Sequence, residues 1–544
     1  MSVDTDNAAF QDALNLIQYT RQSVFLTGKA GTGKSTFLRY VCEHTKKKYV
    51  VLAPTGIAAI NAGGSTMHSF FKLPFYPLLP DDPNLSLQRG RIHEFFKYTK
   101  PHRKLLEQIE LVIIDEISMV RADIIDAIDR ILRVYSHNLR EPFGGKQLLL
   151  VGDVFQLEPV VKNDEREILN RFYPTPYFFS ARVFGQIDLV SIELQKVYRQ
   201  TDPVFVGVLD HIRTNTAGAA DLQLLNTRYG SQIEESEADM YITLATRRDT
   251  VDSINEKKLA ELPGESITFE GVIEGDFPES SLPTSQELVL KPGAQIIFIK
   301  NDFDRRWVNG TIGVIAGIDE EEETIYVITD DGKECDVKRD SWRNIRYRYN
   351  EKTKEIEEEV LGSFTQYPIR LAWAITVHKS QGLTFSRVVI DFTGGVFAGG
   401  QAYVALSRCT SLDGIQLKKP INRADIFVRP EIVNFAGRFN NRQAIDKALK
   451  QAQADVQYAA AARAFNKGDM EECLEQFFRA IHSRYDIEKP VPRRLIRRKL
   501  GIINTLKEQN KKLKEQMREQ QERLRQYAHE YLLMGNECIT QAHD

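Results

Sequence analysis

Runs of consecutive apolar residues alternate with segments of helical spacing through the first part of the chain. Such a run predicts a strand buried on both faces, and apolar residues three or four positions apart predict a helix that packs on the sheet. Phe10, Leu14 and Ile17 have the helical spacing. The runs that predict strands are Val24 to Leu26, Tyr49 to Ala53, Leu111 to Ile114 and Gln147 to Val151. The pattern indicates an α/β domain with a parallel sheet, whose ligands bind at the carboxyl ends of the strands.

A glycine-rich loop lies between the first predicted strand and a helix expected from Thr36 to Glu43. The loop, Gly28 to Thr36, has the spacing and the strand-to-helix setting of a Walker A motif. Its backbone N–H groups can surround a β-phosphate, Lys34 can reach the β- and γ-phosphate oxygens, and the Ser35 hydroxyl can bind Mg²⁺. The residues assigned to the nucleotide here are Gly28, Ala30, Gly31, Thr32, Gly33, Lys34, Ser35 and Thr36. Gln11, upstream, can select ATP by hydrogen-bonding adenine, or it can be an exposed helix residue.

Two later strands end in polar residues suited to phosphoryl transfer. Asp115 and Glu116 directly follow Leu111 to Ile114, as in a Walker B motif. Asp115 is expected to bind Mg²⁺ and Glu116 to activate the attacking water. Gln156 lies three residues after Asp153 at the end of the next strand, where it can orient water or sense the γ-phosphate. These residues predict hydrolysis of a nucleoside triphosphate.

The second half of the chain supplies cations that can face the same phosphate. Arg199 and Arg408 can stabilise the charge that spreads over the γ-phosphate during its transfer. For Arg199 the alternative is a surface residue in an otherwise helical stretch. Gln381 and Gly382 are expected to face the nucleotide cleft. A cation supplied by a second domain would let hydrolysis open the cleft.

Small residues, hydroxyl groups and a few aromatic or basic side chains follow several predicted strands. At strand ends such groups allow the close approach of a phosphodiester backbone, and His or Phe can stack on bases. The residues assigned to a DNA strand, in part only through the resemblance described in the next paragraph, are Pro54, Thr55, Gly56, Thr66, His68, Phe70, Thr246, Thr376, His378 and Lys379. Core or loop packing is the alternative for His68 and Phe70, and a buried histidine at a helix end is the alternative for His378.

The motifs and their order resemble those of superfamily 1 helicases. The similar segments are Pro54 to Ala59 (motif Ia), Asp115-Glu116 (II), Gly152 to Pro159 (III), Val197 to Gln200 (IV), Pro368 to Thr384 (V) and Gln401 to Arg408 (VI). More narrowly, the whole set, the stretch Arg121 to Gly145 and a β-rich insertion resemble the Pif family of DNA helicases, from Phe10 to Lys418. Glu158 departs from the family pattern, which usually has a proline there, so the turn after Gln156 is expected to differ.

This resemblance implies a doubly wound α/β fold of two RecA-like P-loop domains, with ATP and Mg²⁺ between them. The insertion is expected to be a small SH3-like β-barrel, with strands at Gln295 to Ile299, Thr311 to Ile318 and Thr324 to Thr329. For Trp307 and Trp342, packing in the barrel is favoured over contact with nucleic acid. The expected domains are 1–190 (1A, with a wedge subdomain near 64–83), 191–263 with 367–425 (2A), 264–366 (the insert, 2B) and 426–544 (a helical tail).

The same resemblance implies a DNA helicase of the 5′ to 3′ branch, which translocates on single-stranded DNA, acts at forked DNA and unwinds duplexes. The family also implies activity on G-quadruplexes and roles in repair, recombination and telomere maintenance. Two alternatives stay open: a RecD-like motor subunit of a larger DNA-processing complex, and a nucleotide-switched DNA-binding or scaffold protein. The motor core is expected to be monomeric.

The composition of the chain adds little evidence for or against a DNA helicase. The 544 residues suggest three or four domains, and the net charge of −3 gives no global sign of nucleic-acid binding, although local grooves can hold a strand. The five cysteines are too dispersed for a zinc site or a disulfide framework. No targeting segment or membrane span of ~18 apolar residues is recognisable. A cytoplasmic, nucleoid-associated protein of bacterial type is expected, with nucleus and mitochondrion left open.

Beyond Arg423 the pattern becomes helical. Tyr458 to Ile481 resembles one tetratricopeptide helix pair, and Tyr527 to Ile539 is expected to belong to another. A heptad-like stripe is formed by Leu506, Leu513, Met517, Leu524 and Tyr527, with Asn510 and Gln520 as polar members. Residues 491–530 hold 12 Lys/Arg and 5 Asp/Glu. An intramolecular helical hairpin is favoured over an arm that binds a protein partner or DNA.

Overall fold

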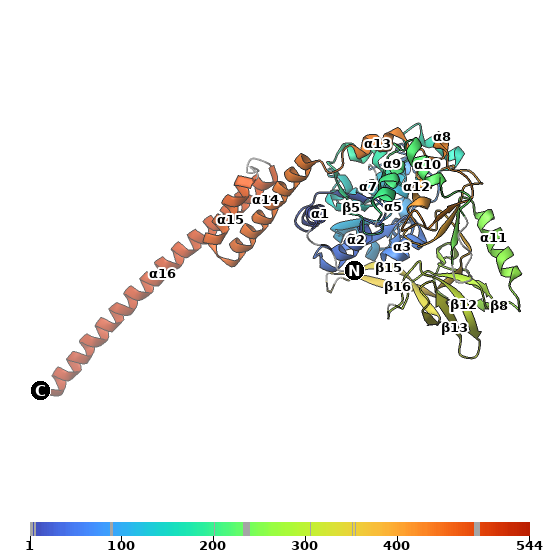
Figure 1. The fold of residues 1–544 in the computed structure, drawn as a ribbon. Coiled ribbons are helices and arrows are strands. Elements are labelled where there is room, and N and C mark those ends of the chain that lie inside the picture. The colour runs from blue at the N-terminus through green and yellow to red at the C-terminus, as the bar shows by residue number, and fades with distance from the viewer. Residues whose placement is uncertain are drawn as a thin grey trace. The chain divides into compact units, whose positions relative to one another are not determined.

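The computed structural model describes residues 4, 7–87, 91–200, 202–231, 240–304, 306–350, 352–353, 355–483 and 490–543. The chain forms two compact units, Met1–Ala452 and Gln453–Asp544. Figure 1 shows the two kinds of structure that compose them, mixed α/β layers in the first and helices alone in the second. Within these ranges no helix has both the length and the hydropathy that a membrane span needs.

Six parallel strands form the first sheet, in the order β3-β2-β4-β5-β1-β6. Their bounds are β1 (Val24–Gly28), β2 (Tyr49–Ala53), β3 (Ser65–Thr66), β4 (Leu111–Ile114), β5 (Gln147–Val151) and β6 (Val190–Leu194). The helices and 3₁₀ turns around it are α1 (Ala8–Tyr19), α2 (Lys34–His44), α3 (Gly56–Ala62), α4 (Met67–Phe71), η1 (Pro83–Leu85), α5 (Arg91–Phe96), α6 (Lys100–Gln108), η2 (Ile117–Met119), α7 (Ala122–Tyr135), η3 (Pro142–Gly145), α8 (Asn163–Leu169), η4 (Phe178–Ser180) and η5 (Arg182–Gly185). The four strands and two helices predicted from the apolar pattern are confirmed.

Strand β6 belongs to the first sheet and shifts the expected domain boundary. Its residues pair in parallel with β1, from Val24 beside Val190 to Gly28 beside Leu194. The boundary expected at residue 190 therefore lies at the start of a strand that completes the first sheet. The first domain therefore continues to Leu194, because all five residues of β6 pair with β1 and most of them are buried there.

Four parallel strands form the second sheet, in the order β18-β7-β19-β20. Their bounds are β7 (Ile242–Ala245), β18 (Ala374–Thr376), β19 (Val388–Asp391) and β20 (Ile415–Leu417). The helices of this part are α9 (Pro203–Arg213), α10 (Ala219–Asn226), α11 (Arg248–Glu261), α12 (Gln401–Leu406) and η7 (Arg423–Asp425). Arg199 lies in the loop between β6 and α9, so the helical stretch considered for it does not form.

The insertion in the second domain is antiparallel. It contains a five-stranded sheet (β14-β13-β12-β11-β17), a pair (β10-β8) and a three-stranded sheet (β15-β16-β9). The bounds are β8 (Ile267–Glu270), β9 (Val272–Gly275), η6 (Glu279–Ser281), β10 (Glu287–Leu290), β11 (Gln295–Phe298), β12 (Ile312–Asp319), β13 (Thr324–Thr329), β14 (Glu334–Val337), β15 (Asp340–Asn350), β16 (Glu355–Gln366) and β17 (Ile369–Leu371). Trp307 and Trp342 are buried, as expected. Because β17 pairs with β11, the antiparallel part ends at Leu371 and not at residue 366.

The long hairpin of β15 and β16 reaches the first domain. Tyr347 and Tyr349 of β15 are buried in the core of that domain, and the Tyr347 hydroxyl accepts a hydrogen bond from the Val51 N–H at 3.3 Å. Phe70 lies beneath this contact, with its ring centre 6.1 Å from that of Tyr347 and 5.5 Å from that of His102. The hairpin thus covers a part of the first domain that the sequence assigned to DNA.

After the second sheet the chain returns to the first domain through α13 (Pro430–Ala436) and the start of α14 (Arg442–Lys467). Phe435 stacks on Phe179, with ring centres 4.4 Å apart. Arg429, just before α13, donates to the Glu158 carboxylate at 2.7 Å, and the Tyr177 hydroxyl donates to the same carboxylate at 3.2 Å. Glu158, the departure from the family pattern, therefore anchors this returning segment.

The second unit is helical throughout its described residues. The later part of α14 pairs with α15 (Met470–Ser483), where the rings of Tyr458 and Phe477 are in contact, and Ala461, Ala464 and Ala480 are buried. This is the helix pair expected near Tyr458 to Ile481. Helix α16 (Pro490–His543) is continuous over 54 residues, so Tyr527 to Ile539 lies within one helix and forms no second pair. The intramolecular hairpin favoured for the heptad stripe is absent for the same reason.

Candidate functional site

The glycine-rich loop connects β1 to α2 through backbone conformations that glycine adopts more easily than other residues. Gly31 and Gly33 have φ angles of 79° and 88°, in the left-handed region that favours glycine. A Cβ at Gly31 would also lie 2.4 Å from Cβ of Arg199. Lys34, the first residue of α2, points back along the loop and donates to the carbonyls of Gly28 at 2.6 Å and Lys29 at 2.9 Å. Burial lowers the pKa of Lys34.

Asp115 and Glu116 follow β4 and face the same space as Lys34. Glu116 has a φ of 50°, and its N–H donates to the Asp115 carboxylate at 2.9 Å. Burial, together with the neighbouring charge of Asp115, raises the pKa of Glu116 to about 7. Burial also raises the pKa of Asp115. A carboxyl with its pKa near neutrality is suited to accept a proton from water.

Asp153 and Gln156 follow β5, and only Gln156 lines the cavity. Asp153 is buried against Arg213, the last residue of α9, whose Nη2 lies 3.0 Å from its Oδ1. Arg213 also contacts Glu193 at 2.9 Å, and its guanidinium lies 4.4 Å from the centre of the Phe155 ring. Asp153 therefore joins the first domain to the second, a role that no local sequence signal indicated.

Two arginines approach from the opposite side. Arg199 donates to the carbonyls of Ser407 and Gly382, both at 3.4 Å. Arg408 is 2% exposed and donates to the carbonyls of Val404, Ser380 and Leu383 and to the Ser407 hydroxyl at 3.0 to 3.3 Å. Burial, and then the charge of Arg199, lowers the pKa of Arg408 to about 9. An anion between these cations would be strongly favoured.

The second domain also touches the glycine-rich loop directly. The Ala30 N–H donates to the Tyr403 hydroxyl of α12 at 3.0 Å. Gly400, just before α12, has a φ of 78°, and a Cβ there would lie 2.3 Å from the carbonyl oxygen of Gln156. These contacts hold the two sides of the cleft together.

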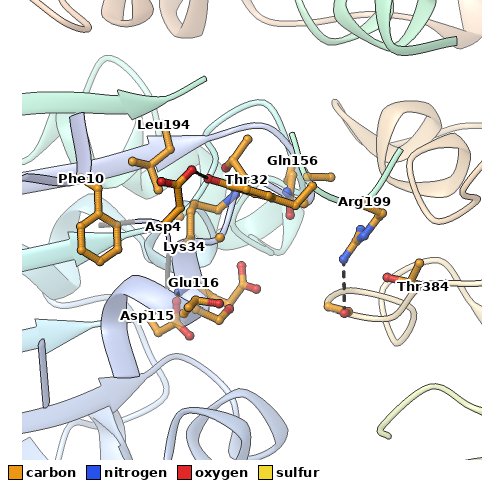
Figure 2. A pocket seen from close by; sticks show the side chains of 18 of the residues that line it. Asp4, Phe10, Thr32, Lys34, Asp115, Glu116, Gln156, Leu194, Arg199 and Thr384 are labelled. Carbon is orange, nitrogen blue, oxygen red and sulfur yellow. Dashed lines mark hydrogen bonds between the residues drawn. The ribbon is translucent and has the colours of Figure 1, made fainter. Parts of the chain in front are cut away.

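A cavity of about 510 Å³ collects these groups. Figure 2 shows Lys34, Asp115 and Glu116 on one side of it and Arg199 with Thr384 on the other. The predicted residues that line it are Ala30, Gly31, Thr32, Gly33, Lys34, Ser35, Thr36, Asp115, Glu116, Gln156, Arg199, Gly382 and Arg408. Gly28 contributes its carbonyl to Lys34, whereas Gln11 and Gln381 are not among the lining residues. The sequence missed Asp4, Asn7, Phe10, Leu194, Tyr198 and Thr384, which line the same cavity.

A second cavity, of about 580 Å³, adjoins the first. It lies among the start of α3, the segment after β18 and the insertion, which contributes Pro283, Asn309 and Trp342. Ser35, Asp115, Glu116 and Gly382 line both cavities. Arg39, Arg370 and Lys379 make part of its wall basic, and burial lowers the pKa of Arg370 to about 10. The arrangement suits a ligand with a polyanionic backbone.

The residues assigned to DNA separate into four groups, of which His68 forms the last. Thr55, His378 and Lys379 line the second cavity. A second group lies outside this cavity, in turns or close contacts: Pro54, Gly56, Thr66, Thr246 and Thr376. Gly56 packs against Ser281, and the Thr66 hydroxyl caps α4. The Thr376 hydroxyl accepts a hydrogen bond from the Lys379 N–H. Phe70 is 4% exposed in the core, which is inconsistent with the expected contact to DNA.

His68 lies outside the second cavity beside an aromatic residue that the sequence did not single out. Phe75 is 83% exposed, and its ring stacks on that of His68 with centres 5.0 Å apart and planes at 11°. Proline-rich irregularity around Phe75 concealed it, because no periodic pattern marks a loop residue as exposed.

The fold and the cleft define the class of this protein: a RecA-like P-loop protein of the helicase type, with two parallel α/β domains around a nucleotide cavity. The family model described as PIF1-like helicase matches residues 4–207. A curated relative, ATP-dependent DNA helicase Pif1 of Bdellovibrio bacteriovorus, is 31% identical over 439 residues, covering 78% of this chain and 90% of the relative. This chain belongs to the Pif1 family of ATP-dependent DNA helicases.

Solved structures of the same family share the fold. The crystal structure of Bacteroides sp. Pif1 in complex with ADP-AlF4 matches with 42% identity and a TM-score of 0.72, covering 79% of this chain and 96% of that one. Bacteroides Pif1 bound to ssDNA matches with 41% identity and a TM-score of 0.58, covering 82% and 99%. Both matches leave part of this chain uncovered.

Proposed function

We propose that this ATP-dependent DNA helicase moves 5′ to 3′ along single-stranded DNA held in the second cavity, driven by ATP hydrolysis in the first. The observation that carries the proposal is the wall shared by the two cavities, where Ser35, Asp115, Glu116 and Gly382 face both. A displacement of these residues on loss of the γ-phosphate would be transmitted directly to the strand. The polarity follows from the family resemblance and not from the geometry.

In the proposed mechanism Lys34 binds the β- and γ-phosphates, and Glu116 accepts a proton from the attacking water, which Gln156 helps to orient. The raised pKa of Glu116, about 7, suits a group that must gain and lose a proton near neutrality. The Ser35 hydroxyl and the Asp115 carboxylate are hard oxygen donors of the kind that Mg²⁺ prefers, and both line the cavity. When bound, Mg²⁺ neutralises phosphate charge; among the described residues no cluster of three His, Cys, Asp or Glu offers it a competing site.

Arg199 and Arg408 are proposed to bind the γ-phosphate from the second domain. Buried Arg408 now donates only to neutral oxygens, and Arg199 further lowers its pKa. A γ-phosphate between the two would pair both cations, and its departure would restore their mutual repulsion. Closing and opening of the cleft follow from this difference in charge.

For the strand we propose a path past Thr55, His378 and Lys379, which line the second cavity. The proposal is supported by the similarity to Bacteroides Pif1, which was solved bound to ssDNA. The insertion, proposed to be SH3-like, adds Asn309 and Trp342 to this path. Forked DNA is the proposed substrate for unwinding, and the stacked His68 and Phe75 are proposed to act as a wedge at the junction. Action on G-quadruplexes, roles in repair, recombination or telomere maintenance, and a cytoplasmic, nucleoid-associated location stay predictions.

The proposal is tested with ATPase and unwinding assays on duplexes that carry a 5′ or a 3′ single-stranded tail. We expect ATP hydrolysis to be stimulated by the strand and unwinding to require the 5′ tail. Unwinding from 3′ tails alone would refute the polarity, and hydrolysis indifferent to DNA would refute the coupling between the cavities. Lys34→Ala is expected to abolish both activities, with Lys104→Ala, on the exposed face of α6, as the control.

A further inference from the structure

Helix α16 carries an apolar stripe that nothing else in the described part of the chain covers. Every residue from Asn504 to Thr540 is exposed. The large apolar side chains on the stripe are between 53% and 74% exposed, from Leu506 near one end to Tyr531 and Met534 near the other. Most helical stability in proteins comes from packing an apolar face, and an apolar face left in water forgoes that contribution. We therefore expect the stripe to be buried against another helix or protein.

The stripe has the strict 3–4 spacing of a coiled coil over five heptads. The a positions are Ile503, Asn510, Met517, Leu524, Tyr531 and Cys538, and the d positions are Leu506, Leu513, Gln520, Tyr527 and Met534. A 7-residue period sustained in this way indicates a left-handed supercoil of helices, not a surface that lies on a globular domain.

We propose that α16 binds a second copy of this chain as a parallel, in-register, two-stranded coiled coil. The two polar core positions select this partner and this alignment. In register, Asn510 meets Asn510 and Gln520 meets Gln520, so each amide can pair with its own copy. In an antiparallel pair of the same extent, Asn510 would face Tyr527 or Met534, and an unpaired buried amide costs about 1–3 kcal/mol. A single asparagine at an a position is also the feature that specifies register and two strands.

Charge permits this alignment. In a parallel pair each g residue faces the e residue five positions later on the other helix. Lys507 and Lys514 at e would then face Ile502 and Gln509 at g, and Arg523 at g would face Ala528. No like charges meet across the core. The basic excess of this region lies instead on outward b and c positions, at Lys511, Lys512, Arg518 and Arg525.

The buried area is sufficient for a stable pair. The core positions from Ile503 to Cys538 span ~54 Å of helix at 1.5 Å per residue. If each core side chain hides on the order of 80 Å², the area that corresponds to about 2 kcal/mol at ~25 cal/mol per Å², the two helices bury roughly 1,700 Å². Stable protein interfaces bury about 1,200–2,000 Å².

Cys538 provides a direct test of orientation. It is exposed and unpaired, and it occupies an a position, where the two copies of a parallel coil are adjacent. Mild oxidation of the full chain by copper phenanthroline and oxygen, which removes two electrons and two protons from the two thiols, should give a covalent dimer through a Cys538 disulfide. An antiparallel pair would hold the two sulfur atoms ~50 Å apart. Cys538→Ser is the control, and a cross-link that survives this change, or no cross-link at all, overturns the parallel alignment.

The mass of the full chain in solution tests association itself. We expect sedimentation equilibrium at micromolar concentration to give twice the 62.2 kDa of one chain. Leu513→Glu combined with Leu524→Glu places charges in the core and should return the chain to a monomer, whereas Leu532→Glu, off the stripe at a b position, should leave the dimer. Strand-stimulated ATPase activity of each variant reports that the first unit is folded.

Two results would overturn the proposal. A mass of 62.2 kDa for the unaltered chain would show that the stripe binds something other than itself, such as DNA or a different protein. A dimer that persists in the doubly charged variant would place the self-association elsewhere. Asn510→Leu offers a further check, because it should strengthen association while relaxing its specificity, so that higher oligomers accompany the dimer.

Discussion

Arg213 joins the two α/β domains, and replacing it with methionine tests that role. The side chain is 4% exposed and lies 3.0 Å from a carboxylate oxygen of Asp153 and 2.9 Å from one of Glu193. Arg213→Met keeps most of the apolar stem that packs on Phe155 and removes the charge that serves both carboxylates. Asp153 is then left fully buried with no cation at that distance.

The expected loss is large because both sides of the contact are desolvated. Removing one partner of a buried ion pair costs about 3–5 kcal/mol, whereas an exposed pair contributes about 0.2–1 kcal/mol. Asp153→Asn should cost less, about 1–3 kcal/mol, because Arg213 keeps Glu193. The double variant should cost less than the sum of the single ones by about 1–3 kcal/mol, since the two residues share one contact.

The assay is urea-induced unfolding of the full chain, followed together with strand-stimulated ATPase activity at low urea. Arg346→Met is the matched control, because Arg346 pairs with Glu359 on an exposed hairpin, 53% and 40% exposed, and should change stability by less than ~1 kcal/mol. If Arg213→Met unfolds at the same urea concentration as this control and hydrolyses ATP normally, the contact does not join the domains. Strictly additive losses in the double variant would equally refute the reasoning.

Three further changes probe the cleft and the DNA path. Tyr403→Phe removes the hydroxyl that accepts from the glycine-rich loop, and it should reduce kcat/KM for ATP by roughly 2- to 13-fold, the equivalent of about 0.5–1.5 kcal/mol; an unchanged kcat/KM would show that the contact is incidental. Gly31→Ala forces a Cβ within 2.4 Å of Arg199 at a left-handed backbone position and should abolish ATPase activity in a folded protein, so retained turnover would contradict the loop geometry. Phe75→Ala removes an exposed ring stacked on His68 and should slow unwinding of forked DNA while ATPase activity on single strands persists; equal losses of both activities would argue against a wedge.

The motif residues could be predicted because each depends on a few neighbours in the sequence. Three glycines and Lys34 require only a strand before them and a helix after them, and Asp115 with Glu116 requires only the end of a buried strand. Local rules are sufficient there, since the backbone conformation of the loop is set by residues within the loop. Arg408 is likewise predicted from contiguous residues, because Gln401 to Arg408 resembles motif VI of the helicases.

Other assignments depended on packing between distant segments, which no local pattern contains. Phe70 has an aromatic side chain that could stack on a DNA base. In the fold, however, it is covered by Tyr347, which lies almost 280 positions later in the sequence. The hairpin of β15 and β16 gives a second example, because it places Arg346 and Arg348 opposite Glu359 and Glu357. Opposite charges across a strand pair are visible only once the register is known.

The sequence by itself therefore determined the nucleotide loop, the order of the motifs and the heptad stripe of the tail, because periodicity and spacing are properties of contiguous residues. Tertiary structure alone decided that β6 completes the first sheet, that Asp153 is paired with Arg213, that Glu158 anchors Arg429, and that the stripe lies on one uncovered helix. Each of these four features depends on how segments far apart in the sequence pack against one another. The packing follows from the burial of apolar surface and the pairing of charges in three dimensions, which no local pattern contains.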